Sequence, residues 1–144
     1  MRKRVTLDSS VLVSAFVGGE AFRPIALQIL RRIFLGEFRA TTSAIVPVEV
    51  CGAISRRSGI EEASLVKRQL EKWEGMGFIA FSALDRGRMR EAVELALRLR
   101  LKGMDAIVVQ VAKEEGAALV TFDEEVARRA KEAVEVLTHG DLGR

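Results

Sequence analysis

Short apolar runs alternate along this chain with longer stretches that mix apolar and polar residues. The short runs, rich in Val, Ile, Leu, Phe and Thr, predict β-strands over residues 4–7, 38–41, 78–81, 118–121 and 134–137. The longer stretches predict helices over residues 11–16, 24–35, 61–73, 85–101, 105–115 and 124–133, with one more that ends near residue 57. Strands and helices therefore alternate from one end of the chain to the other.

Polar and glycine residues mark the expected helix ends. Thr42 or Ser43 can cap the helix that ends near residue 57, because a side-chain oxygen there accepts a bond from a free backbone N–H. Gly116 suits the end of the helix before it, because glycine adopts a left-handed conformation without strain. In the helix over residues 85–101, one face carries the apolar residues Met89, Val93, Ala96 and Leu97.

The predicted strands are largely apolar rather than alternating. Such strands are expected where both faces of a sheet are covered, as in parallel sheets with helices on either side. Strands that alternate with helices point to the same architecture. We find no internal repeat and no linker-like stretch, so we predict a single α/β domain over residues 1–144.

Composition narrows the classes of protein that fit. The chain has 144 residues, 49% of them hydrophobic, which is enough to bury one core. Cys51 is the single cysteine, so neither a disulfide framework nor a cysteine-based zinc site is expected. We expect a soluble, cytoplasmic protein, since the sequence contains no signal peptide pattern and no apolar run long enough to span a bilayer. A net charge of +3 permits a polyanionic partner without requiring one.

Acidic residues recur at one end of the predicted elements. Asp8 directly follows the first strand, and Asp123 follows the fourth strand after one residue. Asp105 lies in the first turn of a helix, and Glu49 lies early in another helix, among apolar neighbours. In open parallel sheets ligands bind beyond the carboxyl ends of the strands. All four acids are expected at that edge.

Carboxylates that lie close together repel one another unless a cation neutralises them. Oxygen ligands without nitrogen or sulfur favour Mg²⁺ or Mn²⁺ over zinc. Each acid taken alone has a structural explanation as a turn former, a helix cap or a first-turn acid. Their coincidence favours a metal site that could activate water and orient a phosphodiester.

Four segments resemble the motifs of PIN-domain nucleases, in the order and spacing of that family. They are LDSSVLV at residues 7–13, PVEV at 47–50, MDAIVVQVA at 104–112 and GAALVTFD at 116–123. The resemblance implies a three-layer α/β/α fold with a five-stranded parallel sheet. It implies cleavage of RNA that depends on Mg²⁺ or Mn²⁺, with Asp8, Glu49, Asp105 and Asp123 as metal ligands and catalytic residues, and with Ser10 and Thr121 in support.

The size of the chain looks like that of the VapC toxins within this family. That likeness implies a homodimer whose activity is blocked by a small antitoxin protein. The basic pair Arg56 and Arg57 is a candidate RNA contact, although a solvated helix face is the more ordinary explanation. His139 has no partner motif, so we expect no role for it as a general base.

Other functions remain open or are disfavoured. A non-catalytic PIN-like module that binds RNA or protein is one alternative, and an RNA-processing nuclease without an antitoxin is another. Phosphate-accepting α/β domains fit less well, since haloacid-dehalogenase-type phosphatases need an Asp where Ser10 stands, and receiver domains need one where Phe81, Ser82 and Ala83 stand. The chain also contains no Gly-rich phosphate loop.

Overall fold

A computed structural model of the chain describes residues 2–143. Its centre is a five-stranded sheet in which every pair of neighbouring strands is parallel, in the order β3-β2-β1-β4-β5. The strands are β1 (Lys3–Leu7), β2 (Phe38–Ser43), β3 (Ile79–Ser82), β4 (Ala118–Val120) and β5 (Val136–Leu137). The predicted α/β class and parallel sheet are confirmed.

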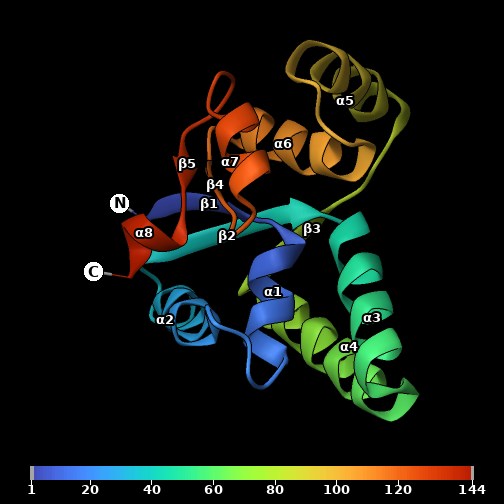
Figure 1. The fold of residues 1–144 in the computed structure, drawn as a ribbon, viewed down its shortest axis with the longest axis vertical. Coiled ribbons are helices and arrows are strands. Elements are labelled where there is room, and N and C mark those ends of the chain that lie inside the picture. Colours follow the sequence, from blue (N-terminus) through green and yellow to red (C-terminus); the bar gives the residue numbers. More distant parts are fainter. Residues whose placement is uncertain (1, 144) are drawn as a thin grey trace.

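Helices cover both faces of the sheet and give three layers (Figure 1). The first group, on one side, is α1 (Ser9–Phe16), α2 (Arg23–Phe34), α3 (Ile45–Ser58) and α4 (Ile60–Gly75). The second group, on the other side, is α5 (Arg86–Leu99), α6 (Gly103–Glu115) and α7 (Glu124–Ala130). A short helix, α8 (His139–Leu142), follows β5 and contacts α2.

The strand order places β1 at the centre of the sheet, between β2 and β4. The chain adds β2 and β3 on one side of β1, then crosses over and adds β4 and β5 on the other side. The carboxyl ends of β1 and β4 are aligned, because Leu7 is in register with Val120. A reversal of this kind opens a crevice at the carboxyl edge of the sheet, where ligands bind in open α/β folds.

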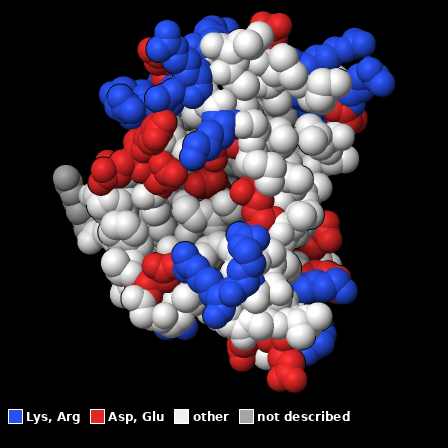
Figure 2. All heavy atoms as spheres, turned by 45° about the vertical axis from the view of Figure 1, so that its right-hand side comes forward, with Lys and Arg blue, Asp and Glu red and all other residues white. Residues whose placement is uncertain are grey.

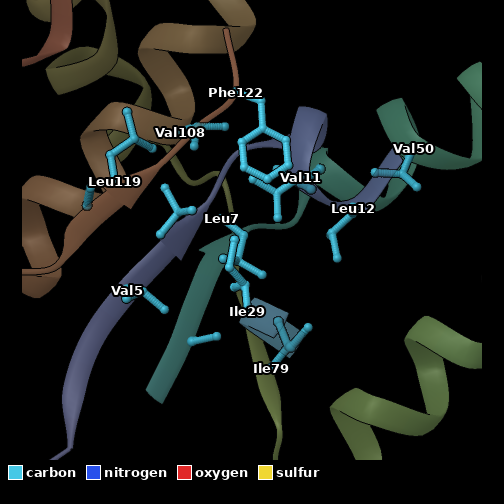
Figure 3. Close-up of a cluster of buried hydrophobic side chains, with 14 of the residues drawn as sticks. Val5, Leu7, Val11, Leu12, Ile29, Val50, Ile79, Val108, Leu119 and Phe122 are labelled. Carbon is cyan, nitrogen blue, oxygen red and sulfur yellow. The ribbon is translucent and has the colours of Figure 1, made fainter. Parts of the chain in front are cut away.

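The core fills both spaces between sheet and helices. In Figure 3, Leu7 of β1 lies in the middle of the cluster, and Val5 of the same strand lies to one side of it. Leu12 of α1 and Ile29 of α2 belong to the same cluster, as does Val108 of α6 on the other side of the sheet. All five of these side chains are at most 1% exposed. Strands that are apolar on both faces are thus explained by burial on both faces.

Two predicted element ends are wrong. Neither Thr42 nor Ser43 is the N-cap residue of α3, a position that Ala44 occupies. Both residues instead extend β2, where they pair with Phe81 and Ser82 of β3. The Thr42 hydroxyl donates to the carbonyl of Leu7 at 2.7 Å, which ties it to β1. Sheet pairing therefore takes precedence over capping here, although Ser43 Oγ still accepts a bond from the N–H of the first residue of α3.

The end of the chain also differs from prediction. The last predicted helix is shorter, and the fifth strand is only two residues long. The helix α8 was not predicted. It begins with a capping box in which Thr138 and Asp141 bond each other's side chains and backbone. The Thr-x-x-Asp spacing was visible in the sequence and could have indicated this helix.

The apolar face predicted for the helix α5 is mostly exposed. Met89, Val93 and Leu97 are 39%, 47% and 72% exposed. The helix packs on α6 through a different stripe, which contains Ala92, Leu95 and Leu99. Both stripes are apolar, so the sequence pattern alone could not select the buried one.

None of the helices among residues 2–143 combines the length and the apolar character needed to cross a lipid bilayer.

Ile29 and Ile60 differ in burial, so the same substitution should affect stability strongly at one and weakly at the other. Ile29 on α2 is 1% exposed and Ile60 on α4 is 76% exposed. We predict that Ile29→Ala lowers the free energy of unfolding by about 2–5 kcal/mol, because it leaves a cavity in the core. Ile60→Ala should change it by less than about 0.5 kcal/mol. Chemical denaturation of both variants measures the difference, and equal losses would contradict the described packing.

Candidate active site

Asp8 is the most deeply buried of the acids predicted from the sequence. It follows β1 as the N-cap residue of α1, and its backbone N–H donates to the carbonyl of Val120 at 3.0 Å. The residue is 4% exposed. Its Oδ2 accepts bonds from the hydroxyls of Ser10 at 2.8 Å and Thr121 at 2.9 Å. The carboxylate is thus held between the ends of two neighbouring strands.

The same two hydroxyls also connect the site to the segment after β4. Ser10 Oγ accepts a bond from the N–H of Phe122 at 3.1 Å. Thr121 Oγ1 accepts one from the N–H of Asp123, also at 3.1 Å. Each hydroxyl therefore donates to Asp8 and accepts from the β4–α7 connection. Ser10 and Thr121 both contact Asp8, and their supporting role in the chemistry stays a prediction.

Asp123 begins the helix α7. Its Oδ1 accepts bonds from the N–H groups of Glu125 at 2.9 Å and Val126 at 3.1 Å, which is the geometry of an N-cap. These bonds fix the orientation of the carboxylate and leave Oδ2 for another partner. The structural and functional interpretations of Asp123 are therefore compatible, because capping uses one oxygen only.

Asp105 and Glu49 reach the site from two other helices. Asp105 lies in the first turn of α6, and Glu49 lies in the second turn of α3. Both are half-buried. The fields of Asp8 and Asp105 act on Glu49, and those of Asp8 and Asp123 act on Asp105. The structure thus brings together the four acids that the sequence indicated.

Burial and mutual repulsion raise the pKa values of these carboxyls. Burial raises the pKa of Asp105 to about 6, with further contributions from Asp8 and Asp123. Burial also raises the pKa of Asp8, against the lowering effect of the Ser10 and Thr121 hydroxyls. The pKa of Glu49 is raised by burial and then by Asp8 and Asp105. Several negative charges are thus held in a region that disfavours each of them.

The donor chemistry of this cluster suits a hard divalent cation. All its ligand atoms are carboxylate oxygens, which Mg²⁺ and Mn²⁺ prefer. Across residues 2–143, however, no three acidic, His or Cys side chains are already close enough to hold a metal ion. Unscreened carboxylates repel one another, so small side-chain movements would have to accompany binding. The residues fit a metal by chemical type and location.

Basic side chains border the cluster. Lys102 precedes α6 and lowers the pKa of Asp105, though less than the acids raise it. Arg129 on α7 pairs with Glu125 at 3.1 Å and donates to the carbonyl of Arg100. A hollow of about 20 Å³ lies between these side chains and the acids Asp105 and Asp123. Figure 2 shows acidic groups across the middle of this face, with basic groups above and below.

Lys102, Glu125 and Arg129 were not predicted from the sequence. No spacing signal singled them out, since each lies in an ordinary helix start or helix face. The predicted basic pair lies elsewhere, in the last turn of α3. Arg57 pairs there with Glu20, and Arg56 is exposed. A role for that pair in binding RNA stays a prediction.

Comparisons with known proteins agree with this fold. The VapC20 toxin of Mycobacterium tuberculosis, described as cleaving the sarcin–ricin loop, superposes with a TM-score of 0.70 at 18% identity, over 86% of this chain and 93% of that one. VapBC2 of Rickettsia felis superposes with a TM-score of 0.67 at 16% identity, over 94% of this chain and 98% of that one. PAE2754 of Pyrobaculum aerophilum superposes with a TM-score of 0.58 at 21% identity, over 94% of this chain and 92% of that one. Identities this low establish a shared fold only.

No curated protein sequence matches the chain. The family model described as PIN domain does match, over residues 5–132. That span contains all four acids and both supporting hydroxyls. Motif order, sheet topology and family match agree, and the chain belongs to the PIN domain family.

Proposed function

We propose that this protein is a ribonuclease that hydrolyses RNA phosphodiester bonds with Mg²⁺ or Mn²⁺. The observation that carries the proposal is the convergence of Asp8, Glu49, Asp105 and Asp123 at one edge of the sheet. The charges of Asp8, Glu49 and Asp105 are disfavoured there by burial and by neighbouring acids. Such a cluster is stabilised by a divalent cation. Membership of the PIN domain family supports a nuclease, and divalent metals are usual in that family.

The bound metal would supply an activated water and charge stabilisation at the phosphodiester. Asp8 is the fixed point of the site, because the Ser10 and Thr121 hydroxyls orient its carboxylate before any ligand arrives. Asp123 offers the oxygen that does not cap α7. Asp105 and Glu49 complete the donor set. Arg129 and Lys102 border the acids and can hold phosphate oxygens of the substrate.

We further propose that the nuclease is the toxin of a toxin–antitoxin pair. Its structural neighbours include VapBC2 of Rickettsia felis and a toxin–antitoxin complex from Klebsiella pneumoniae. The chain has an apolar groove of about 490 Å³ between α1, α2 and α4. Leu27, Phe34 and Leu65 line the groove and are 39–53% exposed. An antitoxin segment with an apolar helical face would cover them.

A homodimer also stays a prediction. Its best candidate surface is the exposed stripe of Met89, Val93 and Leu97 on α5, which lies on the opposite side of the sheet from the groove. An apolar stripe of this kind is unusual on an isolated surface helix.

Substitution of Asp8 tests the proposed chemistry. We predict that Asp8→Asn lowers the rate of RNA cleavage in Mg²⁺ or Mn²⁺ by at least about a hundredfold, because it removes the central anionic ligand. Cleavage of a labelled RNA with and without a chelator measures the effect. Asp85→Asn is the matched control, since Asp85 caps α5 away from the site and asparagine caps equally well. Full activity of Asp8→Asn would refute the assignment.

The raised pKa of Asp105 predicts how stability depends on pH. Because the folded pKa of about 6 exceeds the ordinary value of 3.8, the folded state binds the proton more tightly than the unfolded state. Ionisation of this group therefore lowers stability as the pH rises between the two pKa values, from about 4 to about 6, and part of that loss falls between pH 5 and pH 7. In a chelator at pH 7, we predict that Asp105→Asn raises the free energy of unfolding by about 1–2 kcal/mol, partly offset by the loss of a first-turn acid.

Denaturation at both pH values, with and without Mn²⁺, measures this effect. The advantage of Asp105→Asn should shrink at pH 5, where the wild-type carboxyl is already protonated. Added Mn²⁺ should stabilise the wild type more than the variant, because the metal binds the folded carboxylate site. A variant that is no more stable than the wild type at pH 7 would show that the acids do not repel as described.

A growth experiment tests the toxin role separately. We predict that induced expression of the wild-type chain in a bacterial host arrests growth and that Asp8→Asn does not. Co-expression of the antitoxin gene, expected as a short adjacent reading frame, should restore growth. Leu65→Asp should keep the toxicity but lose this rescue, because it places a charge in the apolar groove.

Ile60→Asp is the matched control for that substitution. It lies on the same helix, is 76% exposed and does not line the groove, so rescue should be retained. Absence of growth arrest by an active nuclease would reject the toxin role alone. Rescue of Leu65→Asp would reject the groove as the docking site.

A further inference from the structure

An aromatic stack lies beside the acid cluster. The ring of Phe22 is stacked on His139, with centroids 4.1 Å apart and an interplanar angle of 17°. Phe22 also makes a tilted ring contact with Phe122, with centroids 5.4 Å apart and an interplanar angle of 54°. The three rings come from the start of α2, the start of α8 and the β4–α7 connection. Three distant segments therefore meet one residue from Asp123.

A pocket of about 220 Å³ opens next to this stack. His139 forms part of its wall, together with Asp123 of the acid cluster. The remaining wall comes from the start of α7 and the residue before α8: Thr121, Phe122, Glu124, Ala127 and Thr138. Asp123 thus separates two hollows, this pocket and the small one shared with Asp105. An RNA strand whose phosphodiester lies over the acids can therefore place the neighbouring nucleotide in the pocket.

Packing explains why α8 is held in place, but it does not require the His139 ring to line a pocket. Contacts between α8 and α2 are sufficient to hold α8, where Leu142 packs against the core. The capping box of Thr138 and Asp141 fixes the start of α8. His139, held at the first helical position, is nevertheless only half-buried and lines the pocket. A ring that is fixed and partly open to a pocket is suited to stacking on a ligand.

We propose that this pocket binds the nucleobase adjacent to the cut phosphodiester, with His139 as its stacking platform. The inference rests on the proposed ribonuclease function. Unstacked RNA bases bind proteins largely by stacking on aromatic and histidine rings. With the phosphodiester over the acids, the neighbouring base lies within reach of the wall that contains Asp123. His139 then acts as a specificity residue and transfers no proton.

Glu124 predicts which bases fit. It lines the pocket and is exposed, and within residues 2–143 it forms no ion pair or side-chain hydrogen bond. A carboxylate accepts hydrogen bonds from the exocyclic amino groups of cytosine, adenine and guanine. Uracil presents a carbonyl at the position of the cytosine amino group, so it would meet the carboxylate unfavourably. The pocket should favour cytosine over uracil.

Short RNAs with a single cut site test this inference. Each RNA carries C, U, A, G or an abasic residue at one of the two positions that flank the cut, and kcat/KM is measured for each. For the wild type, we predict that an abasic residue at one of these positions lowers kcat/KM about tenfold, as expected for loss of one stacked base. Cytosine should be cut faster than uracil at that position.

Variants of His139 separate stacking from other roles. His139→Ala should cut the intact RNA about tenfold more slowly and should no longer respond to the abasic residue. His139→Phe should retain the wild-type response, because its ring stacks without a titratable group. Glu124→Gln should lose the preference for cytosine over uracil.

Leu142→Ala is the matched control, because it loosens α8 without touching the pocket. It should keep the response to the abasic residue. The inference is overturned if the wild type responds to an abasic residue at neither position, or if Leu142→Ala loses the response as His139→Ala does. If the wild type cuts none of the RNAs, the proposed function itself fails, which is a different result.

Discussion

The burial of the Asp8 carboxylate between the ends of β1 and β4 is the constraint on which the site depends. Removal from water disfavours the charge, and two hydroxyl donors only partly compensate. The same hydroxyls accept bonds from the β4–α7 connection, so the carboxylate is part of the join between two strands. These hydrogen bonds therefore keep the carboxylate in position although burial disfavours its charge.

The other acids increase the electrostatic cost instead of relieving it. Asp105 and Glu49 approach from helices on different sides of the sheet, and each raises the pKa of a neighbour or has its own raised. Lys102 and Arg129 border the cluster without neutralising it. An arrangement in which acids repel within a well-packed scaffold is characteristic of functional sites, since the rest of the fold holds them in place.

The surfaces around the site differ in character and lie apart from one another. The α1–α2–α4 groove and the exposed stripe of α5 are apolar and lie on opposite sides of the sheet. The acid edge between them is charged and hollowed, with the His139 pocket at one side. In the proposed function, RNA, an antitoxin and a second copy of the chain would bind different residues. Of the three groove helices, α1 links the antitoxin surface to the acids, because Asp8 is its N-cap residue.

The sequence by itself determined the α/β class, the parallel sheet and the positions of the four acids. Apolar runs and the place of each acid after a strand or at a helix start are local properties, and local properties can be read from a chain. It did not determine which apolar stripe of α5 is buried, that Thr42 and Ser43 extend a strand, or that His139 lies beside Asp123. Those outcomes depend on contacts between residues far apart in the chain, which compete with local preference and are decided only when the elements pack.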